Sequence, residues 1–242
     1  MNAIETTNLT KRYKDLTAVD GLNLTVPAGG LYALLGVNGA GKTTTIKMLS
    51  CLTRPTAGEA LVCGESVTKN PEAVKRQIAV SPQETALAPR LTARENLALM
   101  AGIGGCTGSA ADARIDELSQ RLGLNEVLSR PAGKLSGGWQ RRLSIAMALI
   151  LEPKLLFLDE PTLGLDVIAR SGLWDVIRGL KGRMTVILTT HYLEEAEALS
   201  DCIGVMGGGR LLRTGTADEL KAATGTDTLE AAFLALAKEA AR

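Results

Sequence analysis

The stretch that decides the fold is Gly36-Val37-Asn38-Gly39-Ala40-Gly41-Lys42-Thr43, which fits the pattern G-x-x-x-x-G-K-[ST] without a gap. It follows a short apolar run over residues 31–35, typical of a buried strand, and precedes a stretch from Thr43 to Leu52 that is predicted to be a helix. Glycines let the backbone wrap so that successive N–H groups face a phosphate, and the helix start adds positive potential. The pattern therefore predicts a phosphate-binding loop.

Two side chains of this loop have distinct expected roles. Lys42 can reach the β- and γ-phosphates of a nucleotide, and the Thr43 hydroxyl can bind Mg²⁺. A chance glycine-rich loop is the alternative, and the position between a strand and a helix argues against it. We expect the nucleotide contacts of the loop to come from Gly36, Asn38, Gly39, Ala40, Gly41, Lys42, Thr43 and Thr44.

A second apolar run, Leu155-Leu156-Phe157-Leu158, ends in the two carboxylates Asp159 and Glu160. Ligands of α/β sheets bind at the carboxyl ends of the strands, so Asp159 is placed to hold Mg²⁺ and Glu160 to polarise a water. An Asp-Glu pair by itself indicates no more than a solvated turn. Together with the phosphate-binding loop, it predicts a hydrolytic site.

The segment Ser136-Gly137-Gly138 is predicted to start a helix. A serine followed by two glycines leaves backbone N–H groups open to an anion, although simple capping of the helix is the alternative. A second phosphate-binding helix start is redundant within one subunit. It is useful if it serves a nucleotide held mainly by another subunit.

The bulk composition is that of an ordinary globular protein. Its 242 residues are 45% hydrophobic and 22% charged, with a net charge of +1, so no global field attracts nucleic acid or an anionic membrane. No apolar run approaches the roughly 18 residues that span a bilayer, and the first residues lack the pattern of a secretory signal. The scattered cysteines favour free, mostly buried thiols in a reducing cytoplasm over a zinc site or disulfides; they are Cys51, Cys63, Cys106 and Cys202.

The order of predicted elements indicates an α/β nucleotide-binding core with a parallel sheet, an antiparallel β part and an inserted helical subdomain. Short strands are expected over residues 1 to about 30 and about 58 to 80, buried parallel strands over 155–159 and 186–190, and a hairpin over 203–206 and 210–213. We expect one domain over 1–242. Its parts are the core (1–83 and 152–226), a helical subdomain (84–151) and a C-terminal helix (227–242).

Several helix boundaries follow from local signals. Thr92 with Glu95 and Thr216 with Glu219 are predicted capping boxes. Ser109 is expected to precede a helix with Ile115, Leu118 and Leu122 on one apolar face, and Pro153 to end the helix that Ser136 opens. The stripe of Leu229, Phe233 and Leu236 in the C-terminal helix is expected to pack on the body of the protein rather than on a partner.

With these motifs in this order, the chain resembles the ATP-binding subunits of ABC transporters over essentially its whole length. Leu135-Ser136-Gly137-Gly138-Trp139-Gln140 resembles the family's signature motif, the most specific of the set. Gly164-Leu165-Asp166 is similar to the D-loop. The resemblance implies the ABC ATPase architecture, ATP and Mg²⁺ as cofactors, and ATP hydrolysis coupled to transport.

The resemblance also implies roles for single residues. Tyr13 matches the aromatic residue that stacks on adenine, Gln83 the glutamine that touches Mg²⁺ and the attacking water, and His191 the histidine that contacts the γ-phosphate. Each has a plain alternative, since a lone Gln is usually a surface residue and a lone His or Tyr is often structural. Catalysis is then expected from Lys42, Gln83, Glu160 and His191, metal binding from Thr43, Gln83 and Asp159, and nucleotide contacts also from Ser136, Gly137 and Gly138.

The expected partners are a separate integral membrane subunit and a second ATP-binding subunit that is identical or related. No nucleic-acid partner is expected. The expected location is the cytoplasmic face of a bacterial cell membrane. The segment from Thr189 to Glu197 and the residues from Thr228 to Leu234 resemble the drug and antibiotic-resistance exporter branch. Three residues depart from the pattern: Val37 replaces a usual Pro, Trp139 a usual Gln or Met, and Gly164 a common Ala.

Two other functions fit parts of the sequence. A soluble ABC protein acting on ribosomes or DNA usually has two cassettes or a long coiled coil, whereas this chain has one cassette, no heptads and no basic tract. A scaffold that binds ATP without hydrolysing it would not need Glu160 and His191. Neither the cargo nor the direction of transport follows from the sequence.

Overall fold

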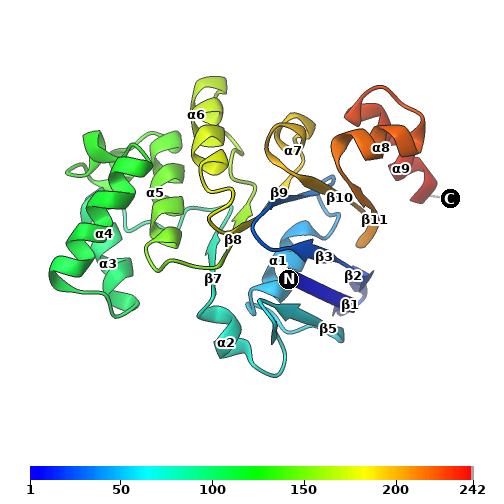
Figure 1. Cartoon of the computed structure of the whole chain (residues 1–242), viewed down its shortest axis with the longest axis horizontal. Helices are drawn as coiled ribbons and strands as arrows, with labels where there is room; N and C mark the ends of the chain where they lie inside the picture. Colours follow the sequence, from blue (N-terminus) through cyan, green and yellow to red (C-terminus); the bar gives the residue numbers. More distant parts are fainter. Residues whose placement is uncertain (241–242) are drawn as a thin grey trace.

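The computed structural model describes residues 1–240 and shows two β-sheets with helices around them (Figure 1). The larger sheet has the strand order β11-β10-β4-β9-β8-β7, and all neighbouring pairs are parallel except β10 with β11. The parallel strands end at one edge, where the phosphate-binding loop follows β4. These strands are β4 (Leu31–Leu35), β7 (Ile78–Ser81), β8 (Leu155–Asp159), β9 (Thr185–Thr190), β10 (Cys202–Gly207) and β11 (Arg210–Gly215).

The smaller sheet is antiparallel and has the order β2-β1-β5-β6, with β3 pairing with another part of β1. Its long first strand runs through both pairings and ends beside the start of β2. These strands are β1 (Asn2–Tyr13), β2 (Leu16–Leu22), β3 (Thr25–Pro27), β5 (Ala57–Val62) and β6 (Glu65–Ser66).

Strand alternation divides the interior into two hydrophobic cores. In β4, Leu31, Ala33 and Leu35 face one core, while Tyr32 and Leu34 face the other. Successive side chains of a strand point to opposite faces, so a strand buried on both faces is apolar throughout. One core continues into the helical subdomain, and the other lies against α1 and the antiparallel sheet.

Three helices of one segment gather at one end of the molecule, drawn in green in Figure 1. They are α3 (Ala93–Ile103), α4 (Gly108–Arg121) and α5 (Gly137–Leu149), with short 3₁₀ helices over Asn125–Val127 and Ala132–Lys134. The other helices are α1 (Lys42–Leu49), α2 (Pro71–Lys75), α6 (Val167–Arg178), α7 (Leu193–Leu199), α8 (Ala217–Thr224) and α9 (Leu229–Ala240). Among residues 1–240, no helix combines the length and the apolar character that crossing a membrane requires.

Some of the elements predicted from local sequence signals are confirmed, and others are wrong. Both capping boxes, Thr92 with Glu95 and Thr216 with Glu219, are confirmed. The expectation of strands alone over 58–80 was wrong, because Pro71 follows Asn70 and starts the five-residue helix α2. The position of Ser109 was also wrong, since it lies inside α4.

The C-terminal helix packs as expected. Leu229 and Leu236 are buried against the body of the protein, and Phe233 is partly buried beside them. The expected helix over 227–242 is seen as Leu229–Ala240, and residues 241–242 lie outside the described part.

All four cysteines are free thiols, as expected, but each is partly exposed, so the expectation that they are mostly buried was wrong.

Candidate functional site

Glycine is required in the phosphate-binding loop because other backbone segments come very close. Gly41 has φ +99°, and a Cβ there would lie 2.5 Å from the carbonyl oxygen of Ala18. A Cβ at Gly36 would lie 2.7 Å from the carbonyl oxygen of Met206. The loop is therefore fixed by β2 and β10, and its tight path follows from the fold around it.

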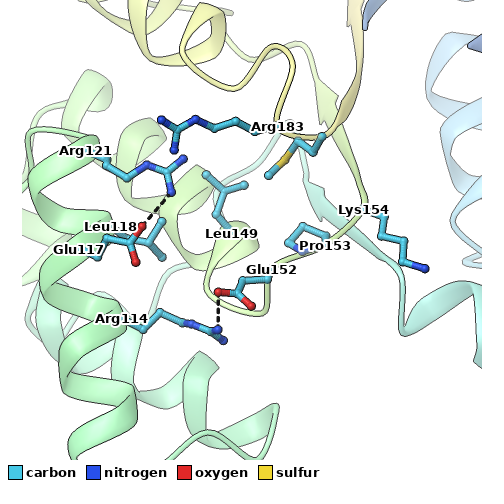
Figure 2. A pocket seen from close by; sticks show the side chains of 10 residues that line it. Arg114, Glu117, Leu118, Arg121, Leu149, Glu152, Pro153, Lys154 and Arg183 are labelled. Carbon is cyan, nitrogen blue, oxygen red and sulfur yellow. Dashed lines mark hydrogen bonds and ion pairs between the residues drawn. The ribbon is translucent and has the colours of Figure 1, made fainter. Parts of the chain in front are cut away.

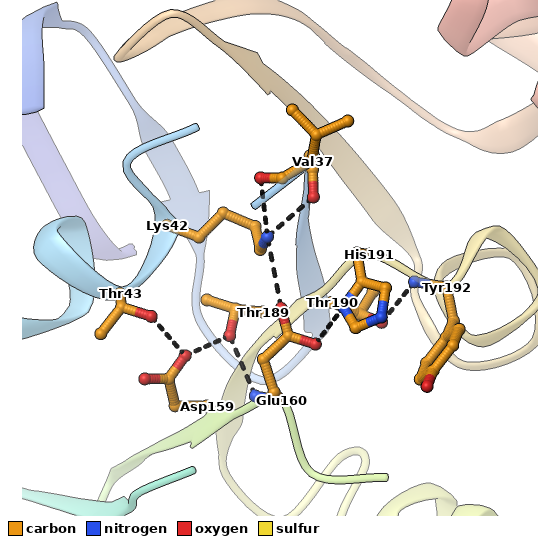
Figure 3. Close-up of polar contacts among 10 residues, drawn as sticks. Val37, Lys42, Thr43, Asp159, Glu160, Thr189, Thr190, His191 and Tyr192 are labelled. Atoms are coloured by element: carbon orange, nitrogen blue, oxygen red, sulfur yellow. Dashed lines mark hydrogen bonds and ion pairs between the residues drawn. The ribbon is translucent and has the colours of Figure 1, made fainter. Parts of the chain in front are cut away.

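Lys42 is the first residue of α1, and only 5% of its surface is exposed. Its Nζ donates hydrogen bonds to the carbonyl oxygens of Gly36 at 2.7 Å and Val37 at 3.2 Å (Figure 3). It also forms an ion pair with Glu160 Oε1 at 3.2 Å. Charge-assisted hydrogen bonds therefore fix this buried ammonium group above the loop.

Asp159 ends β8 and is held from two sides. Thr43 Oγ1 donates to Asp159 Oδ1 at 3.1 Å, and Thr189 Oγ1 donates to the same oxygen at 2.5 Å. Thr189 lies beside Asp159 on β9, in register with it. The adjacent strand therefore orients the carboxylate toward the hydroxyl at the start of α1.

Glu160 adopts an uncommon backbone conformation, with φ +49°. Such a left-handed conformation costs about 1–2 kcal/mol for a residue with a side chain, and it recurs at functional sites. The Glu160 N–H donates to Thr189 Oγ1 at 3.0 Å, and Oε2 lies 2.7 Å from His191 Nδ1. With 6% of its surface exposed, Glu160 is fixed between Lys42 and His191.

Gln83 faces the same cavity, and α5 holds its backbone in place. Arg141 Nη1 donates to the Pro82 carbonyl oxygen at 2.7 Å, and Nη2 to that of Gln83 at 2.6 Å. One turn along α5, the Ser144 hydroxyl pairs with that of Ser81 at 2.9 Å. The helix that begins at the signature motif thus clamps the segment leading to Gln83.

The cavity over the phosphate-binding loop encloses about 620 Å³. Of the predicted site residues it brings together Asn38, Gly39, Ala40, Gly41, Lys42, Thr43, Thr44, Gln83, Glu160 and His191. Sequence reasoning missed other lining residues, namely Leu16, Thr17, Ala18, Leu163, Gly208 and Gly209. They come from the start of β2, the loop after Glu160 and the turn between β10 and β11, without a motif of their own, so no sequence signal marked them.

Tyr13 and the signature residues lie outside this cavity. Tyr13 is 43% exposed at the end of β1, paired across the hairpin with the lining residue Leu16, and Lys11 Nζ is 5.0 Å from its ring centre. Ser136 occupies the N-cap of α5, but its side chain makes no capping hydrogen bond. The exposed Ser136 and Gly137 are therefore free to contact something outside this subunit.

A second cavity, of about 440 Å³, lies between α4 and the loops that precede β8 and β9 (Figure 2). Ion pairs border it, Arg114 with Glu152 at 2.5 Å and Arg121 with Glu117 at 3.2 Å. None of the predicted site residues lines it. It lies at the amino ends of β8 and β9, whereas Asp159 and Glu160 follow the carboxyl end of β8.

The fold and the site together define a P-loop ATPase with an inserted helical subdomain. Comparison with known proteins narrows the class, because the family described as ABC transporter matches residues 19–163. The daunorubicin/doxorubicin resistance ATP-binding protein DrrA of Streptomyces peucetius is 46% identical over 228 residues, which is 94% of this chain and 69% of that protein. The Nod factor export ATP-binding protein I of Burkholderia lata is 42% identical over 229 residues, 94% and 75% of the two chains.

Solved structures agree with this comparison. An ATP-binding subunit of an ABC transporter has a TM-score of 0.85 and 31% identity, covering 97% of this chain and 99% of that chain. A dimeric ATP-binding cassette in a post-hydrolysis state with ADP and Pi has a TM-score of 0.79 and 27% identity, covering 88% and 98%. The chain belongs to the ABC transporter family, as an ATP-binding and ATP-hydrolysing subunit.

Proposed function

We propose that Glu160 is the general base of ATP hydrolysis and that Lys42 and His191 set its position. The observation that carries the proposal is the single carboxylate held at 3.2 Å by Lys42 and at 2.7 Å by His191, above the phosphate-binding loop. When ATP binds, Lys42 would turn to the phosphates, and His191 would contact the γ-phosphate. Glu160 would then be free to accept a proton from the attacking water.

The donor set beside the loop fits Mg²⁺. Thr43 Oγ1 and Asp159 Oδ1 are 3.1 Å apart, and Gln83 lines the same cavity. Hydroxyl, carboxylate and amide oxygens are the ligands that this hard cation prefers. We propose that these three residues hold the metal ion directly or through water. When bound, it would neutralise charge on the phosphates.

We propose that two subunits face each other head to tail, as an identical pair or a related one. Each would hold ATP on its own loop, with Tyr13 stacked on adenine, and Ser136, Gly137 and Gly138 of the other subunit would close over it. The uncapped Ser136 hydroxyl and the exposed Gly137 support this arrangement. The dimeric post-hydrolysis relative supports it as well.

We propose that the dimer powers export through a separate integral membrane subunit, at the cytoplasmic face of a bacterial membrane. The names of the relatives support export, since one is a drug resistance protein and another serves Nod factor export. A drug-like cargo would be recognised by the membrane subunit. ATP-driven closure and reopening of the two ATP-binding subunits would move that subunit between its states.

Reconstitution tests this function. The chain is purified with the membrane protein encoded beside it and placed in vesicles with ATP outside. Uptake of daunorubicin and ATPase activity are then measured, with Lys42→Ala as the inactive control. ATP-dependent uptake that the control lacks is the expected result. ATP hydrolysis stimulated by ribosomes or DNA instead would favour the soluble class, and ATP binding without hydrolysis would favour a scaffold.

A further inference from the structure

A buried carboxyl group lies behind the candidate site and takes no part in the contacts described so far. Glu195 is on α7, four residues after His191, and none of its surface is exposed. Trp174 Nε1 on α6 donates a hydrogen bond to Glu195 Oε1 at 3.2 Å. Glutamate is almost never fully buried without partners, so the position of Glu195 needs an explanation.

Buried polar atoms without a hydrogen-bond partner are concentrated around Glu195. Within residues 1–239, four buried side-chain nitrogen or oxygen atoms have no hydrogen-bond partner, and three belong to Glu195, Thr162 and Arg170. Thr162 flanks Glu195, and Arg170 lies one turn before Trp174 on α6. Native proteins leave few buried polar atoms unpaired, so a group of three around one carboxyl group needs an explanation.

The chain positions of the neighbours connect this network to the reaction. Thr162 is two residues after Glu160, in the loop that leads to α6. Thr190, which also flanks the carboxyl group, is the last residue of β9 and precedes His191. The hydrogen bond from Trp174 to Glu195 joins α6, which follows the loop after Glu160, to α7, which follows His191.

A charged group of the candidate site, Glu160, also acts on Glu195. Burial raises the pKa of this carboxyl group, and the hydroxyls of Thr190 and Thr162 offset part of the shift. Glu160 adds to it through its negative charge. Arg141 on α5 is near enough for a mutual electrostatic effect. Changes at Glu195 thus act on groups next to the reacting centre.

We propose that Glu195 is a positioning residue for hydrolysis, whose buried carboxyl group, held by Trp174, ties α7 after His191 to α6 after the loop of Glu160 and so keeps Glu160 and His191 in their relative positions. The inference rests on the proposed roles of those two residues. Glu195 does not line the cavity over the phosphate-binding loop. Its effect is on the rate of hydrolysis and not on the affinity for ATP, because the nucleotide cavity does not include it.

The first experiment compares three variants of the whole chain by steady-state ATPase kinetics and by ATP binding. Glu195→Ala is expected to lower kcat about 10- to 100-fold, the scale seen when a supporting contact of a reactive group is lost. Its KM for ATP and its ATP affinity are expected to stay within about twofold. Glu195→Gln keeps a hydrogen-bonding side chain of the same shape, and it is expected to retain most of kcat.

Glu197→Ala is the matched control. Glu197 is on the same helix but exposed, and it pairs with Lys221 on α8. Its kinetics are expected to match those of the unsubstituted chain. A purely structural role of Glu195 would instead lower the melting temperature and the ATP-binding fraction of Glu195→Ala, while kcat per ATP-binding molecule stayed unchanged. That result would overturn the inference.

A double-mutant cycle tests the proposed tie between α6 and α7. Trp174→Phe removes the Nε1–H that donates to Glu195 and keeps an aromatic ring, and it is expected to lower kcat in the same direction. If both side chains act through one contact, the double variant with Glu195→Ala is no slower than the slower single variant. Multiplicative losses in kcat would show two independent effects and would contradict the proposed tie.

Glu160→Gln, measured alongside, separates failure of this inference from failure of the proposed function. If Glu160→Gln hydrolyses ATP normally, the role of Glu160 is wrong, whatever Glu195 does. If Glu160→Gln is inactive and Glu195→Ala keeps its full kcat, only the inference about Glu195 fails. Loss of kcat in Glu195→Gln equal to that in Glu195→Ala would also contradict it, because the hydrogen-bonding shape would then be irrelevant.

Discussion

At the scale of single residues, the site depends on side chains that several strands bring to one point. Glu160 receives an ion pair from Lys42 at the start of α1 and a hydrogen bond from the residue after β9, and its backbone is held by Thr189. The sequence predicted Glu160 because it follows an apolar strand. It could not predict Thr189, since a threonine in a buried strand is more often a packing residue and its partner is 30 residues away.

Replacing Glu160 with Gln removes the proposed base and preserves the volume of the side chain. Turnover is expected to fall by roughly 10²-fold or more, the usual scale for losing a positioned base. ATP binding should survive because the loop and Lys42 are unchanged, and the closed dimer should accumulate with ATP. Single-turnover hydrolysis and size-exclusion chromatography measure the two effects. Near-normal hydrolysis would show that another group activates the water.

The ring of Tyr13 is the second residue to test. Stacking on adenine contributes about 1–3 kcal/mol, so Tyr13→Ala should raise KM for ATP about 5- to 150-fold. Tyr13→Phe and Tyr13→Trp keep an aromatic face and should have much smaller effects. ATPase kinetics over a range of ATP concentrations gives the comparison. Equal increases in KM for all three variants would indicate that Tyr13 acts by packing or through its hydroxyl.

At the scale of elements, the sequence patterns predicted the buried strands beside the site and missed the short helix α2. The apolar runs of β4 and β8 are buried on both faces, and their carboxyl ends carry the loop and the carboxylates as the sequence indicated. The five residues of α2 are too few to show a helical period, which is why strands alone were expected there. The clamp from α5 to Gln83 was not predictable, because Arg141 finds its carbonyl partners 59 and 58 residues earlier.

Arg141→Met tests whether α5 controls Gln83. Two carbonyl oxygens lose their charged donor, and a hydrogen bond from a charged group contributes about 1.5–3 kcal/mol, so unfolding by urea should occur at a lower concentration. If Gln83 binds Mg²⁺ only when clamped, the Mg²⁺ concentration for half-maximal ATPase should rise as well. Arg142→Met is the control, because Arg142 donates to the Leu122 carbonyl oxygen at 3.5 Å and lies over the Trp139 ring, away from the segment of Gln83. An unchanged Mg²⁺ requirement in Arg141→Met would mean that the clamp serves stability alone.

At the scale of the whole molecule, the helical part and the sheet share one hydrophobic core. Buried residues of α3, α4 and α5 belong to the same cluster as Leu156, Leu158 and Leu188 of the sheet. This continuity supports the proposal that the core, the helical part and the C-terminal helix form one domain. It also packs the helix that begins at the signature motif against the sheet whose strand β8 leads to Glu160.

The shared site between two subunits is the prediction that separates this family from an ordinary P-loop enzyme. The exposed and uncapped Ser136 lies outside the cavity that holds Lys42 in the same chain. Ser136→Arg should therefore leave ATP binding by the isolated subunit nearly intact, as equilibrium binding can show. The long cationic side chain would fill the space of the partner's γ-phosphate, so closure and hydrolysis should collapse.

A mixture of Ser136→Arg and Lys42→Ala subunits gives the sharper test, provided that mixed dimers form. In a head-to-tail dimer of the two variants, one composite site carries both substitutions and the other carries neither. ATPase activity of the mixture should then exceed that of either variant alone, because the intact site can turn over. Tags on the two subunits allow the mixed dimer to be purified and its composition verified. Loss of ATP binding in isolated Ser136→Arg, or no recovery in the verified mixed dimer, would remove the main support for a site shared between subunits.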